Sequence, residues 1–246
     1  MIEAVIYLLV IAGAEAVTVF CVPLWGILCH ITILIAIIVR SALVNRYLHE
    51  RLMLPLALVP LLRVISLGMS LTDIPRVVSY HLSYTPLLVS AAVVVSVLRY
   101  DANDIGLNSK RLGMQLLVGA SGILLGLAGY VILRPEPIIA DFARLDVWLP
   151  ALILLLFTGF AAEFVFRGVI QRGAIEAFGG WGIVYVSLLF AALYIGFLPI
   201  TWWTAFAFVI SLYFGWIAKA TRSILGVALA HGICNIALYL IIPFLS

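Results

Sequence analysis

Apolar residues occur along this chain in long, nearly uninterrupted runs rather than in the alternating or one-sided patterns of soluble strands and helices. A helix needs about 20 predominantly apolar residues to cross the hydrocarbon core of a bilayer. We therefore predict an all-α fold, a polytopic integral membrane helical bundle of about nine transmembrane helices, of which the sixth is longer than one crossing requires. The predicted spans cover residues 4–21, 23–44, 52–72, 82–99, 113–133, 147–177, 181–198, 200–218 and 223–245.

The composition argues against a soluble domain and against several kinds of site. Of the 246 residues, 65% are hydrophobic and 10% are charged, whereas about 25% of the residues of a soluble domain are charged. The net charge is +3 and the basic residues are scattered, so we expect no nucleic-acid partner. The three cysteines, Cys21, Cys29 and Cys234, lack the spacing of a metal site. We expect neither a metal ion nor another cofactor.

The two longest polar connections, at 100–112 and 134–146, divide the chain. Residues 1–100 form the first predicted unit, with about four transmembrane helices and few polar motifs. Residues 101–246 form the second predicted unit, a transmembrane core of about five helices that contains every strong motif.

Lysine and arginine are distributed unevenly between the loops, and cytoplasmic loops of membrane proteins carry the excess. If the N-terminus is cytoplasmic, nine basic residues fall in inner loops and three in outer loops. We therefore predict a cytoplasmic N-terminus and a C-terminus outside. The inner residues are Arg40, Arg46, Arg51, Arg99, Lys110, Arg111, Arg172, Lys219 and Arg222, and the outer residues are Arg76, Arg134 and Arg144.

Strongly polar side chains interrupt the sixth and ninth spans. Glu163 and Arg167 lie four residues apart, and so do His231 and Asn235, which places each pair on one face of its helix. An ionised side chain at the centre of a membrane helix costs about 2.5–3.5 kcal/mol, so such residues face the bundle interior. We therefore expect the two polar stripes to share one interior cavity.

A second set of polar residues occupies the first three spans. Glu15, His30 and Arg63 are each costly in a bilayer when alone. We expect Glu15 and Arg63 to form an ion pair that His30 joins, with a role in helix packing. A proton relay is the alternative role for this set.

The polar motifs resemble those of the CPBP family, the CAAX-protease and bacteriocin-processing (Abi) membrane proteins. The resemblance covers about residues 105–240 and implies an all-helical membrane core whose motifs converge on a cavity within the bilayer. Active members are similar to glutamate-dependent intramembrane proteases that cut prenylated or small peptide substrates. The resemblance leads us to expect a prokaryotic cell membrane. It rests on Glu163-Phe-Val-Phe-Arg167-Gly168, Ser187 to Tyr194, Phe214 to Trp216, Thr221 to Leu225, and Ala230-His231-Gly-Ile-Cys-Asn235.

The sequence departs from the family pattern at two positions. Ala162 stands where the family has its first glutamate, and Tyr194 stands where it has its first histidine. By family analogy, those two groups hold and deprotonate the attacking water. A methyl group and a phenol with a pKa of about 10 do not serve as that base at neutral pH. His231 and Asn235 resemble the element that stabilises the oxyanion, which needs a nucleophile to assist.

These observations leave three hypotheses for function. The favoured one is a non-catalytic membrane scaffold or binding subunit for a lipid, a peptide or a partner membrane protein. In it, Glu163 and Arg167 form a structural clamp, Tyr194 fills the vacated histidine position, and His231 and Asn235 hydrogen-bond between helices. The alternative is an active endopeptidase that uses Glu163 with His231 and Asn235 on a lipidated or other peptide substrate. The third hypothesis is a transporter-like role for a small solute or a proton.

Overall fold

The computed structural model describes residues 2–44, 47–72, 74–139, 147–196 and 202–245. Within these ranges every regular element is a helix and no strand occurs, which confirms the predicted all-α membrane bundle. Eight helices are long and apolar enough to cross a membrane, and a ninth apolar helix is shorter. The elements are α1 (Ile2–Phe20), α2 (Pro23–Leu43), α3 (Tyr47–Leu56), α4 (Leu58–Ser70), α5 (Arg76–Val97), α6 (Leu112–Leu133), α7 (Trp148–Ile153), η2 (Leu154–Ala161), η3 (Phe164–Ile170), α8 (Gln171–Phe178), α9 (Trp181–Ile195), α10 (Trp202–Thr221), α11 (Leu225–Ile236), η4 (Ala237–Ile241) and η5 (Ile242–Phe244).

The third and fourth predicted spans differ most from the helices observed. The third span is made of α3 and α4, which are interrupted at Ala57. Pro60 explains the interruption, because its ring clashes with the carbonyl of residue 56 and it has no N–H to donate. The fourth span begins at Arg76 rather than at 82, so a stretch that contains Tyr80 and His81 is helical despite its polar side chains.

The sixth span is a continuous helix of 31 residues, Trp148–Phe178, that consists of α7, η2, η3 and α8. Its two central segments, η2 and η3, have the wider turns of a π-helix. Such turns are rare and occur frequently at functional sites. Glu163 lies between them, so the widened part of the helix carries the first polar motif.

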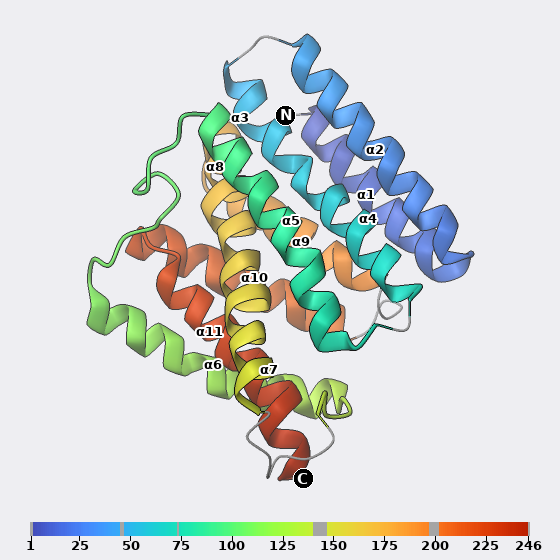
Figure 1. Ribbon diagram of the computed structural model, residues 1–246. Coiled ribbons are helices and arrows are strands. Elements are labelled where there is room, and N and C mark those ends of the chain that lie inside the picture. The colour runs from blue at the N-terminus through green and yellow to red at the C-terminus, as the bar shows by residue number, and fades with distance from the viewer. Residues whose placement is uncertain (1, 45–46, 73, 140–146, 197–201, 246) are drawn as a thin grey trace.

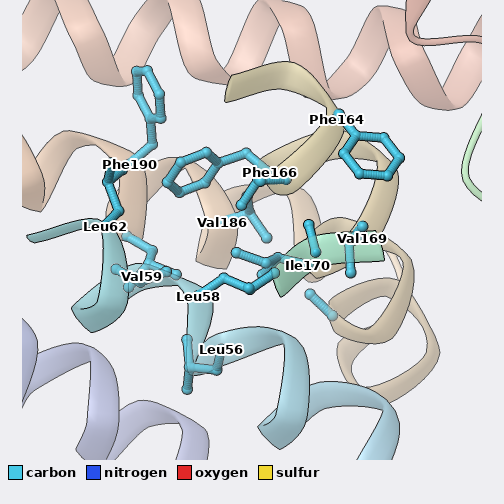
Figure 2. Close-up of a cluster of buried hydrophobic side chains, with 14 of the residues drawn as sticks. Leu56, Leu58, Val59, Leu62, Phe164, Phe166, Val169, Ile170, Val186 and Phe190 are labelled. Atoms are coloured by element: carbon cyan, nitrogen blue, oxygen red, sulfur yellow. The ribbon is translucent and has the colours of Figure 1, made fainter. Parts of the chain in front are cut away.

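The core of the bundle lies where α3–α4, the sixth span and α9 meet. Figure 2 shows the buried side chains of this region, which come from all three segments. Helices at the edges instead expose apolar side chains, as expected for contact with lipid; Leu117 and Val131 of α6 are more than two-thirds exposed. The labelled core residues are Leu56, Leu58, Val59, Leu62, Phe164, Phe166, Val169, Ile170, Val186 and Phe190.

The first helices pack against one side of this core. Figure 1 shows α1 and α2 side by side at one edge of the bundle, whereas α6 and α11 lie together at another. Tyr185 of α9 donates a hydrogen bond to the carbonyl oxygen of Ala4 (3.0 Å), which ties α1 to the core. Glycines allow α6 to approach α11: an added Cβ at Gly126 would lie 2.9 Å from the carbonyl oxygen of Cys234. The domain boundary near residue 100 stays a prediction.

Candidate functional site

Glu163 is the centre of the first buried polar cluster. Its side chain is fully buried, and its Oε1 lies 2.7 Å from Nδ1 of His231 on α11. Arg167, one turn along the same helix, donates from Nη1 to Oε1 (3.2 Å) and places Nε 3.1 Å from Oε2. Both oxygens of the carboxylate therefore face a cationic or imidazole nitrogen. The two polar stripes therefore meet in the interior, while the cavity that we expected them to share stays a prediction.

Arg167 also connects the cluster to α10. Its Nη2 donates to Oγ of Ser211 (2.9 Å) and to the carbonyl oxygen of the same residue (3.3 Å). The guanidinium lies 4.9 Å from the centre of the Phe190 ring, within the range of a cation–π interaction. Arg167 thus neutralises the buried carboxylate and bonds to a second helix at the same time.

Two glycines set the distance between Glu163 and His231. A Cβ added to Gly159 would lie 2.8 Å from backbone atoms of Gly232, and one added to Gly232 would lie 2.9 Å from Cα of Leu155. A side chain at either position would push η2 away from α11. Because both are glycine, the backbones approach closely enough for the carboxylate to reach the imidazole.

Asn235 bonds to the sixth span rather than to Glu163. Its Nδ2 donates to Oγ1 of Thr158 (2.9 Å), which in turn donates to the carbonyl oxygen of Leu154 (2.6 Å). Asn235 and His231 therefore attach the same face of α11 to the sixth span at two neighbouring levels. The predicted interhelical hydrogen bonding is present at both residues.

Tyr194 and Ala162 occupy the two positions that depart from the family pattern. Ala162 is buried and presents no polar side-chain atom. The Tyr194 ring packs against the rings of Phe190 (5.4 Å between centres) and Trp203 (6.1 Å), and the Arg167 guanidinium lies 4.9 Å from the centre of the same Phe190 ring. Tyr194 thus adjoins the cluster, while its predicted hydrogen bond to Glu163 or His231 stays a prediction.

Sequence reasoning missed two partners of the site, Ser211 and Thr158. Neither has a motif around it that marks it, because a single hydroxyl in a membrane helix is commonly satisfied by a carbonyl of its own helix. Only the crossing of the helices shows that each also receives a hydrogen bond from a second helix.

No group of three or more histidine, cysteine, aspartate or glutamate side chains that could hold a metal ion occurs among the residues that the structure describes. The site contributes one carboxylate and one imidazole.

Comparison with known proteins bears on this same region. Residues 144–237 match the family model described as Type II CAAX prenyl endopeptidase Rce1-like. This part of the chain is therefore similar to the CAAX proteases, and it lies within a chain whose helices are long and apolar enough to cross a membrane. The match covers Glu163, Arg167, Tyr194, His231 and Asn235, and it confirms the resemblance stated from the motifs. No curated protein and no solved structure matches the chain.

Proposed function

We propose that this CAAX-protease-like chain is non-catalytic and acts as a membrane scaffold or binding subunit. One observation carries the proposal: the only carboxylate of the described site, Glu163, is fully buried and bonded to Arg167 and His231. A general base must lie within hydrogen-bonding reach of the water that it deprotonates. Both oxygens of Glu163 already face nitrogens of Arg167 and His231, so the carboxylate is occupied by partners within the protein.

The same contacts support a structural role. Glu163 bonds to α11 through His231, and its partner Arg167 bonds to α10 through Ser211. One carboxylate thereby connects three membrane helices. Removal of one member of a buried ion pair typically costs about 3–5 kcal/mol. A scaffold needs such a rigid frame, whereas the third hypothesis, a transporter, has no particular contact in its favour and stays a prediction.

Cleavage of a prenylated peptide by the purified chain in liposomes tests the proposal. We expect no cleavage by the wild type, and none by Glu163→Gln or His231→Ala. The matched control is Arg99→Gln, which removes a charge from an exposed position outside the site. Cleavage by the wild type and by Arg99→Gln that is lost in both site variants would contradict the proposal.

Affinity purification from native membranes tests the binding role separately. We expect a membrane protein, peptide or lipid to be retained in a constant ratio to the chain. A chain that purifies alone and free of lipid would contradict the role of binding subunit even if no cleavage occurs.

A second candidate, the active endopeptidase, has one observation in its favour. The contact between Oε1 of Glu163 and Nδ1 of His231 is the arrangement by which a carboxylate orients a catalytic imidazole, leaving Nε2 for a substrate proton. The His231 side chain is 12% exposed, whereas the Glu163 side chain is fully buried. The cleavage assay separates this candidate from the first, because it requires both residues for activity.

A further inference from the structure

A polar cavity of about 870 Å³ lies at the basic end of the bundle, and its lining includes Arg167 but neither Glu163 nor His231. Most of its lining comes from three segments: the loop between α5 and α6, helix α8, and the end of α10 with the turn to α11; Arg167 of η3 adds to it. The three segments are loops or helix ends that the charge distribution assigns to the same side of the membrane. Its volume is within the range of about 300–1,000 Å³ typical of small-molecule sites.

Four cationic side chains line this cavity without an ion pair among the described residues: Lys110, Arg111, Lys219 and Arg222. All four are exposed. Their charges therefore add to one another at the cavity, and nothing within the described part of the chain neutralises them.

The carboxylates of the cavity are already engaged by other groups. Glu176 accepts from Arg51 (3.0 Å) and from Arg172 (2.9 Å). Asp104 lies 3.4 Å from Arg172, and Asp101 and Asp104 each accept a hydrogen bond from the backbone N–H of the other. The cavity consequently keeps a surplus of positive charge, which favours an anionic ligand.

The walls of the cavity are held in place without a ligand. Asn108 donates from Nδ2 to the carbonyl oxygen of Arg222 (2.6 Å), and Ser223 donates from Oγ to the carbonyl oxygen of Asn108 (2.8 Å). Gly106, with φ +73°, accepts from the N–H of Ile224 (3.0 Å). A Cβ at Gly106 would lie 3.1 Å from that nitrogen, so the close approach needs glycine. Preformed walls lower the entropy lost when a ligand binds.

The position of the cations relative to the membrane helices indicates the kind of anion. Arg111 directly precedes α6, and Lys219 and Arg222 lie at the end of α10, next to the start of α11. These helix ends mark the depth of the lipid headgroups. Basic pockets between membrane helices on the cytoplasmic side bind phosphate-bearing headgroups.

We propose that this cavity is a binding site for a phosphate-bearing ligand, and that the headgroup of an anionic phospholipid supplies the phosphate. Arg167 of the first site also lines the cavity, but its guanidinium is paired with Glu163. The proposal does not depend on whether the chain cleaves peptides, because it rests on the four unpaired cations and not on Glu163 or His231.

The test titrates the detergent-purified full chain with short-chain phosphatidylglycerol and follows the thermal unfolding midpoint. We expect a saturable rise with phosphatidylglycerol and none with zwitterionic phosphatidylcholine. The double variant Lys219→Gln/Arg222→Gln should need at least about tenfold more phosphatidylglycerol, because it removes two of the four unpaired cations of the cavity. Arg99→Gln, at an exposed position on the same side but outside the cavity, should bind as the wild type does.

The outcomes distinguish the source of the phosphate. Equal protection by soluble glycerol phosphate, lost in the double variant, would support the phosphate site but assign it to a soluble ester. Equal protection of wild type and double variant by phosphatidylglycerol would overturn the proposal, and so would equal protection by phosphatidylcholine. If the double variant unfolds at a lower temperature than the wild type without lipid, the same titration is made with the single variant Lys219→Gln, which should also need more phosphatidylglycerol than the wild type.

Discussion

Two buried polar clusters among the described residues have the same composition, each with one glutamate, one arginine and one histidine. In the first, Arg63 of α4 donates to both oxygens of Glu15 of α1, from Nε to Oε1 and from Nη2 to Oε2 (2.7 Å). His30 of α2 places Nε2 3.1 Å from Oε1 of the same carboxylate. The expected cluster of Glu15, Arg63 and His30 is therefore confirmed, and each member comes from a different helix.

The second cluster, around Glu163, differs in how it is assembled and in how far it is closed. Its glutamate and arginine lie on one helix, four residues apart, and only the histidine comes from elsewhere. His30 is completely buried, whereas the His231 side chain is 12% exposed. The same three residue types thus form one fully buried cluster, around Glu15, that joins three helices, which we call the sealed cluster. They also form a second cluster, around Glu163, in which the histidine alone is partly exposed.

The two clusters are not independent in space. Gly196, two residues after Tyr194, packs so closely on Glu15 and Arg63 that an added Cβ would overlap both side chains. The N-terminal helices therefore contact the end of α9 that carries the altered family position.

The largest effect should come from breaking the sealed cluster. Arg63→Met leaves the Glu15 carboxylate buried opposite His30 alone, and we expect a loss of about 3–5 kcal/mol of unfolding free energy. Reversible unfolding in mixed micelles measures it. The double variant Glu15→Leu/Arg63→Met should recover part of the loss, because it removes the unpaired charge. A loss under about 1 kcal/mol, the value of an exposed pair, would show that the cluster is not sealed.

A smaller effect should follow from crowding the sealed cluster. Gly196→Ala introduces a methyl group where the ion pair leaves no room, and overpacking of this kind costs about 1–3 kcal/mol. Gly180→Ala is the matched control, since nothing lies within 4 Å of its added Cβ. Unfolding in the same micelles should separate the two variants; equal stability would mean that α9 and the ion pair move apart freely.

The finest test compares the two histidines directly. Modification by diethyl pyrocarbonate, followed by mass spectrometry, should label His231 before His30, because a fully buried imidazole reacts only after local opening. The peptide assigned to His231 should lose its label in the His231→Gln variant, which confirms the assignment. Faster labelling of His30 would reverse the contrast between an open and a sealed cluster.

Several features of the fold could be predicted from local sequence alone. Runs of apolar residues determine the spans because each crossing must satisfy its own backbone hydrogen bonds and face lipid. The spacing of Glu163 and Arg167 determines their pairing, since residues four apart on a helix are neighbours. The cost of isolated charges in a bilayer was sufficient to predict the pairing of Glu15 with Arg63.

Other features depend on how helices cross, which no local pattern contains. The break between α3 and α4 was detectable from Pro60, but the π-type turns on either side of Glu163 were not. Ser211 and Thr158 became partners of the site only because α10 and α11 lie against the sixth span.

The sequence by itself determined that this is a helical membrane protein, which polar residues must be buried, and which two positions lack the groups of a family protease. Only the tertiary structure decided which cluster is sealed, which imidazole keeps access, and that scattered basic residues line one cavity. The physical reason is the separation along the chain of the residues that interact. Hydrophobicity and helical spacing depend on residues that are near neighbours in the chain. The exposure of a histidine and the charge surplus of a cavity depend on segments that are distant in the chain and meet across the bundle, as Gly159 meets Gly232.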